Sequence, residues 1–144
     1  MTIEPPTDIQ RAILDACISA CAQGAPDLAE ALREQLDEYA IRAVEHCSVC
    51  FDIVQANGGV VGIGPRLRLD VASLGKQRIT HESSPLVFEP AQIMDDAPEY
   101  VLLLLWHEEG IVIGLEVSYL GDHHPALEDI ALPLEWIPES PEVA

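Results

Sequence analysis

The segment 46–50, His-Cys-Ser-Val-Cys, carries the side chains with the most familiar chemical spacing in the chain. A C-x-x-C pair beside a histidine can bind zinc or act as a redox dithiol. A redox pair needs its first cysteine at the start of a helix, but alternating apolar residues predict a strand here. Side chains three apart in a strand point to opposite faces, so Cys47 and Cys50 cannot reach one metal. We therefore predict a core position for Cys47, and also for Cys17 and Cys21, which share one face of a predicted helix.

A second cluster, Asp122-His123-His124, combines carboxylate and imidazole groups that suit Zn²⁺ or another divalent transition metal. The alternative is a polar loop that follows a strand, and we prefer it. If the cluster does hold a metal, the protein is a small metal-binding protein or enzyme that uses Asp122, His123 and His124, with His46 or His81 as a further ligand.

Glu116 is the acidic residue with the most specific setting, because it lies inside a strongly apolar predicted strand. A half-buried carboxylate needs a hydrogen-bond donor. Arg66 or Arg68, on the polar face of its own predicted strand, can pair with Glu116 across the sheet. The alternative is a glutamate that faces water. No second catalytic group lies beside Glu116, and no nucleophile or phosphate-binding motif occurs, which favours a protein that is not an enzyme.

The charges of the chain are unevenly distributed. The net charge is −18, and no Lys or Arg follows Arg78, although more than half of the 25 acidic residues do. Phosphates are bound by Lys and Arg, so this distribution argues against nucleic acid and favours a basic protein partner. Candidate contact residues are Glu108, Glu109, Glu116 and Asp122. An immunity or antitoxin protein that blocks a basic toxin is one such binding protein; the alternative is that the acidity serves only solubility.

Two predicted helices begin the chain. Thr7 and Gln10 form a capping box before a helix over about 8–23, which ends near Gly24. Asp27 and Glu30 form a second capping box, and a stripe of apolar residues extends the second predicted helix over about 27–43. The short connection predicts that the two helices pack as an antiparallel hairpin.

A sheet is predicted over about 46–119. Residues 67–71 alternate apolar and polar side chains, and residues 59–64 are rich in glycine and predict a loop or kinked strand. Residues 100–107 and 111–119 form a hairpin in which Gly110 takes the positive φ of the turn. The first of these strands is apolar on both sides, so it is expected at the centre of the sheet. In the second strand, one face is expected to carry Ile111, Ile113, Leu115, Val117 and Tyr119.

The same hairpin carries a resemblance. The run 102–110, Leu-Leu-Leu-Leu-Trp-His-Glu-Glu-Gly, followed by Gly-Leu-Glu-Val at 114–117, resembles a pattern in small uncharacterised bacterial proteins. In them a leucine-rich strand, an acidic-glycine turn and a strand with a Leu-Glu pair recur. The resemblance implies a bacterial α+β domain and no activity.

Together these elements predict one α+β domain. A helical hairpin packs on a mainly antiparallel sheet, and residues 120–144 form an extended, proline-rich wrap anchored by apolar side chains. The start lacks the basic and apolar regions of a signal peptide, and the longest apolar run, 101–106, is too short to span a membrane. Reduced thiols and a cytoplasmic location are therefore expected. The oligomeric state stays open, because either the helices or another subunit can cover the second apolar face of the hairpin.

Overall fold

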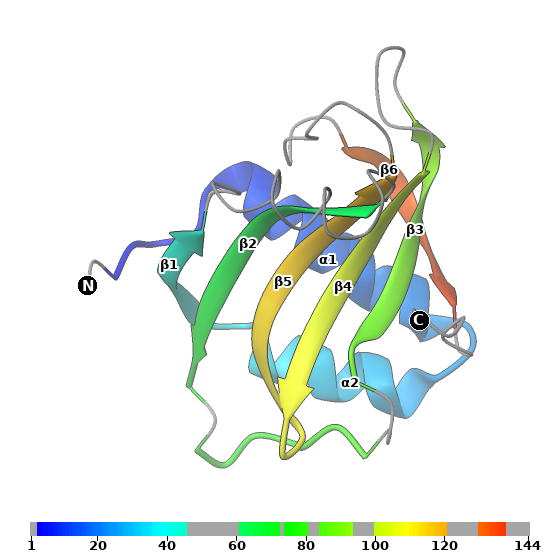
Figure 1. Ribbon diagram of the computed structural model, residues 1–144. Coiled ribbons are helices and arrows are strands. Elements are labelled where there is room, and N and C mark those ends of the chain that lie inside the picture. The colour runs from blue at the N-terminus through cyan, green and yellow to red at the C-terminus, as the bar shows by residue number, and fades with distance from the viewer. Residues whose placement is uncertain are drawn as a thin grey trace.

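The fold is a six-stranded antiparallel sheet with two helices packed on one face (Figure 1). The computed structural model describes residues 3–45, 61–72, 74–80, 84–93, 100–120 and 130–137. The strands lie in the order β1-β2-β5-β4-β3-β6. Their bounds are β1 Tyr39–Glu45, β2 Val61–Val71, β3 Leu86–Ile93, β4 Tyr100–Glu108, β5 Ile111–Leu120 and β6 Ile130–Ile137. The α+β class and the central position of the β4–β5 hairpin, both predicted from the sequence, are confirmed.

Helix α1, Asp8–Ala22, begins as its sequence predicts. The Thr7 hydroxyl accepts a hydrogen bond from the Gln10 backbone N–H, and the Thr7 N–H donates to Gln10 Oε1 at 2.8 Å. This reciprocal capping box satisfies donors that the first turn would otherwise leave unpaired.

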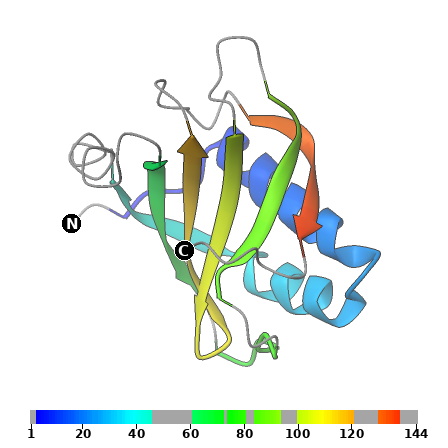
Figure 2. The same cartoon turned by 45° about the vertical axis from the view of Figure 1, so that its right-hand side comes forward.

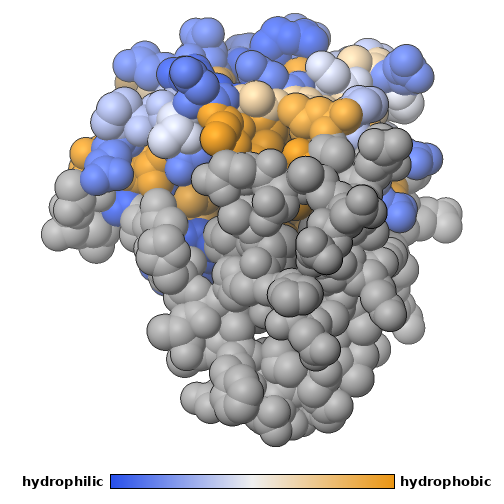
Figure 3. Space-filling model, turned by 90° about the horizontal axis from the view of Figure 1, so that it is seen from above, coloured by the Kyte–Doolittle hydropathy of each residue, from blue (hydrophilic) through white to orange (hydrophobic). Residues whose placement is uncertain are grey.

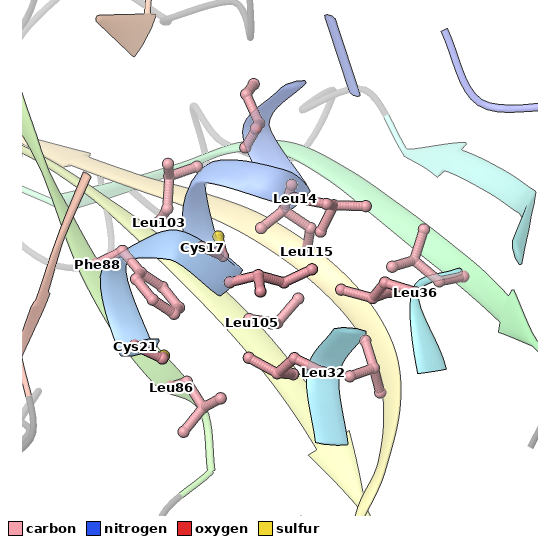
Figure 4. Close-up of a cluster of buried hydrophobic side chains, with 14 of the residues drawn as sticks. Leu14, Cys17, Cys21, Leu32, Leu36, Leu86, Phe88, Leu103, Leu105 and Leu115 are labelled. Atoms are coloured by element: carbon pink, nitrogen blue, oxygen red, sulfur yellow. The ribbon is translucent and has the colours of Figure 1, made fainter. Parts of the chain in front are cut away.

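The helices and the sheet enclose one main core (Figure 4). Leu14 and Cys17 of α1 and Leu32 of α2 lie over Phe88, Leu103, Leu105 and Leu115 of the sheet, all of them buried. Cys17 and Cys21 occupy core positions, as predicted. Burial raises the pKa of the Cys21 thiol to about 12 and also raises that of Cys17, so both stay protonated near neutral pH and are poor nucleophiles.

The second predicted helix is too long. Helix α2 covers Pro26–Gln35, and the chain then turns and enters strand β1, which pairs with β2. The apolar stripe of 36–43 fits a helix, but Tyr39 and Ile41 also alternate with Ala40 and Arg42, and pairing with β2 selects the strand. The second capping box is also wrong. Ala25 is the N-cap with no side-chain bond, and Pro26 supplies a preset φ at the first helical position.

Gln35, at the end of α2, fastens the β4–β5 hairpin to the helix. It is fully buried, and its Nε2 donates to the carbonyls of Gln77 and Gly110, each at 2.8 Å. Its Oε1 accepts from the Val112 N–H at 2.9 Å. Glu109 and Gly110 form the turn with φ of 53° and 81°, which confirms the positive φ predicted for Gly110.

A β-bulge changes which side chains of β5 face the core. Trp106 lies opposite Gly114, but His107 lies opposite Val112, so Ile113 is an extra residue in the ladder. Val112 is therefore buried in the core, and Ile113 is 42% exposed. The predicted alternation of β5 is correct at Leu115 and Val117 and wrong at Ile113.

The segment predicted as a C-terminal wrap contains a sheet strand. β6 pairs antiparallel with β3 and forms an edge of the sheet beside α1 (Figure 2). Of the apolar residues expected to anchor this segment, Leu134 and Trp136 pack against the main core, whereas Leu132 is 43% exposed. The glycine-rich segment predicted as a loop or kinked strand lies partly in β2, whose pairing with β5 shifts between Ile63 and Arg66.

Candidate functional site

Glu116 is buried on the sheet face opposite the helices. It is 5% exposed, and its Oε2 accepts a hydrogen bond from the Trp106 indole Nε1–H at 2.7 Å. Its backbone partner in β4 is Leu104, which is buried with Val87 and Leu102 in a second, smaller apolar cluster. The expectation of a buried carboxylate is therefore met, and sequence reasoning missed its indole donor.

Arg66 lies directly opposite Glu116 in the register of β2 and β5, and Arg68 lies opposite Gly114. Residues opposite each other in an antiparallel pair have Cβ atoms about 5 Å apart, which places Arg66 within reach of Glu116. A Glu116–Arg66 pair therefore stays a prediction that the strand register favours.

The other predicted site residues are spread over the chain. Glu108 and Glu109 are exposed at the β4–β5 turn, where the Glu109 carbonyl accepts a hydrogen bond from the Arg78 guanidinium at 2.7 Å. Asp122, His123, His124, His46, His81, Cys47 and Cys50 lie outside the described residues. Among the described residues, no three His, Cys, Asp or Glu side chains are grouped to hold a metal ion.

A groove lies between α1 and the edge strand β6. Its volume is about 1140 Å³. We call it the α1–β6 groove; its lining is Ala12, Asp15, Ala16, Ser19, Ala20, Gln23, Gly24, Leu132, Pro133, Leu134, Glu135 and Trp136. Figure 2 shows α1 and β6 side by side, although they are far apart in the sequence.

Small residues on α1 make room for the groove. Ala12, Ala16 and Ala20 recur every four residues, so they share one face of the helix and project little from it. At the end of α1, a Cβ on Gly24 would lie 3.4 Å from the Trp136 ring, so the indole packs against the glycine backbone. On the other wall, Leu134 is buried and Leu132 is 43% exposed. The groove therefore offers a mainly apolar surface with one aromatic ring.

The charged residues that line the α1–β6 groove are Asp15 and Glu135, both exposed carboxylates. Glu135 also lies opposite Glu89 of β3, a like-charge pair that is unfavourable across two strands. Neither Lys nor Arg is among the described residues of the lining, so the groove has an apolar floor with Asp15 on its helix wall. Glu135 alternates with Leu134 and Trp136 along β6, so its carboxylate lies at the rim of the groove.

Comparisons with protein families, curated proteins and solved structures find no match for this chain. The site must therefore be judged from its own chemistry. Within the described residues, no helix is long and apolar enough to cross a membrane.

None of the described residues that line the α1–β6 groove was predicted from the sequence as a site residue. Leu134 and Trp136 line the groove, but their pairing with β3 and their position beside α1 depend on long-range contacts. The repeat of Ala12, Ala16 and Ala20 is the sequence signal that could have indicated a shallow helix face.

Seen from above, hydrophobic surface lies beside hydrophilic atoms on the side of the molecule where the helices lie (Figure 3). The described residues also include the exposed apolar side chains Ile3 and Ile9, near or at the start of α1. Apolar surface next to charged surface is typical of protein contacts.

Proposed function

We propose that the protein is a non-enzymatic binding protein whose α1–β6 groove receives an amphipathic, cationic segment of a basic protein. The observation that carries the proposal is the combination of an apolar floor with carboxylates and no cation in the lining. Apolar side chains of the partner segment would pack on Leu132, Leu134 and Trp136. Its Lys or Arg side chains would reach Asp15 on α1 and Glu135 at the rim of the groove.

The overall charge supports the same class of partner. A chain with net charge −18 attracts a basic protein at long range and repels acidic ones, which raises association rates at low salt. Exposed carboxylates on both helices, among them Asp8, Asp27 and Glu30, extend the negative surface beyond the groove. An immunity or antitoxin protein that neutralises a basic toxin is one form of this function.

The test uses a synthetic amphipathic peptide of leucine and lysine as a probe, titrated into the full-length ¹⁵N-labelled protein. The indole N–H resonance of Trp136 reports the α1–β6 groove, and a Trp136→Phe variant assigns it. We expect the peptide to shift this resonance, with an affinity that falls as salt is added. A peptide in which glutamate replaces every lysine should not shift it.

Matched double variants separate the groove from net charge. Asp15→Asn with Glu135→Gln removes the two groove carboxylates, and Glu30→Gln with Asp37→Asn removes two exposed carboxylates elsewhere. The first pair should weaken peptide binding about tenfold, or about 1.4 kcal/mol, and the second pair much less. Equal weakening in both would contradict a groove site, because it would show that the peptide responds only to net charge.

A further inference from the structure

A second hollow lies over β1, β2, β5 and β4. Its volume is about 350 Å³. We call it the arginine pocket, because three arginines are among the described residues of its lining, which include Arg42, Arg66, Arg68, Trp106, Glu108 and Ile113. These three arginines are a large share of the 7 basic residues in a chain of net charge −18. Such a concentration of cations is unexpected in so acidic a protein.

A glycine at the centre of one cross-strand row opens the arginine pocket. Gly114 lies between Arg68 of β2 and Trp106 of β4, which are its partners on either side. A Cβ on Gly114 would lie 2.9 Å from the Leu67 carbonyl oxygen, so the backbone packing here requires glycine. Because this residue has no side chain, it leaves space between Arg68 and Trp106, which both line the pocket.

Two β-bulges add side chains to the arginine pocket. The β1–β2 register shifts between Ile41 and Ala43, so Arg42 is an extra residue in β1, and Ile113 is the extra residue in β5. Bulges redirect side chains and are enriched beside functional sites. Here both extra residues line the same pocket, one with a positive charge and one with an exposed apolar surface.

The charges inside the arginine pocket favour an anion. Among the described residues of its lining, Glu108 carries a carboxylate, and Glu116 accepts a hydrogen bond from the indole of Trp106, which also lines the pocket. Arg66 and Arg68 have interaction partners within the chain. Each guanidinium carries five N–H donors in a planar fork, so an arginine that holds one partner can still donate to a bound carboxylate or phosphate.

We propose that the arginine pocket binds a small organic anion, with its carboxylate or phosphate group on Arg42, Arg66 and Arg68. Its apolar body lies against Trp106 and Ile113. A volume of about 350 Å³ is near the lower end for ligand pockets, which fits a ligand with a single ring. This site is separate from the α1–β6 groove and takes the opposite charge.

The test titrates benzoate, phenyl phosphate and inorganic phosphate into the full-length ¹⁵N-labelled protein. The reporter is the Trp106 indole N–H, which already donates to Glu116 and should respond to a nearby anion. We expect benzoate or phenyl phosphate to shift this resonance in a saturable way. The tighter of the two identifies carboxylate or phosphate as the preferred group, and inorganic phosphate alone should bind more weakly.

Two arginine variants complete the test. Arg42→Gln removes a pocket cation at an exposed bulge position, and Arg33→Gln removes an exposed cation on α2, with the same change in net charge. The first should weaken binding of the aryl anion about tenfold, and the second should leave it unchanged. Three results would overturn the proposal: no Trp106 shift at millimolar aryl anion, equal effects of the two variants, or inorganic phosphate binding as tightly as phenyl phosphate.

Discussion

The α1–β6 groove and the arginine pocket lie on different strands of one sheet and differ in charge, size and construction. The groove is lined by a helix and an edge strand and contains carboxylates without Lys or Arg, whereas the pocket is lined by strands and contains three arginines. The wall of the groove is part of the main core, because Leu134 and Trp136 pack into it. A net charge of −18 therefore agrees with the charge of the groove but not with that of the arginine pocket.

The difference in construction predicts a difference in stability. Substitutions in the wall of the groove should lower the free energy of unfolding, because they also remove contacts in the main core. Variants at the exposed rim of the arginine pocket should change binding and leave stability nearly intact.

The largest effect is expected at Leu134, which lines the groove and is buried in the main core. Leu134→Ala should lower the free energy of unfolding by about 2–5 kcal/mol, because it removes buried methyl groups and leaves a cavity. Urea denaturation measures the change. Leu132→Ala, at the exposed position of the same strand, is the control and should cost much less. Similar losses of unfolding free energy in both variants would contradict the packing of Leu134 in the main core.

Gln35 should have the next largest effect, because it holds the hairpin that carries Trp106, Ile113 and Gly114 of the arginine pocket. Gln35→Leu would leave the Gln77 and Gly110 carbonyls and the Val112 N–H without their side-chain partner. Because these buried groups would be left unpaired, we expect the free energy of unfolding to fall by about 3 kcal/mol. Thermal denaturation checks it, with the exposed Gln23→Leu as the control. A loss no larger than that of the control would contradict the role of the Gln35 hydrogen bonds in holding the hairpin on α2.

Glu116→Gln should have an intermediate effect. The amide keeps an acceptor for the Trp106 indole but loses the charge that faces Arg66 across the strands. We expect a loss of about 1–2 kcal/mol in the free energy of unfolding, measured by denaturation. Glu109→Gln at the exposed turn removes the same charge and should change stability little. An unchanged stability of Glu116→Gln would contradict a buried pair between Glu116 and Arg66.

Arg42→Gln should have the smallest effect on stability, within about 0.5 kcal/mol, because Arg42 is an exposed extra residue in β1. Denaturation curves should overlay those of the native chain, even though the variant weakens anion binding. A larger loss would show that Arg42 supports the sheet, and the contrast between a structural groove and a binding pocket would then fail.

Much of the fold could be predicted from local signals. Helix α1 has a capping box at Thr7 and Gln10, and the β4–β5 hairpin has glycine where the turn needs positive φ. The end of α2 could not be predicted, because residues 36–43 fit both a helical stripe and a strand. Only pairing with β2, which comes later in the chain, decides between them.

The sites were harder to predict than the fold, because both depend on register and long-range pairing. Arg66 and Arg68 were recognised as possible partners for Glu116, and the register supports that choice. Arg42 was placed in a helix, so its position beside them could not be found. The α1–β6 groove needs the pairing of β6 with β3, which the proline-rich sequence of that segment does not reveal.

The most direct test uses the two tryptophans of the chain, since Trp136 lines the groove and Trp106 lines the arginine pocket. One ¹⁵N-labelled sample is titrated first with the leucine-lysine peptide and then with the tighter aryl anion, while both indole N–H resonances are followed. The account predicts that the peptide shifts Trp136 alone and that the anion shifts Trp106 alone. A peptide that shifts Trp106, or an anion that shifts Trp136, would contradict two separate sites of opposite charge preference.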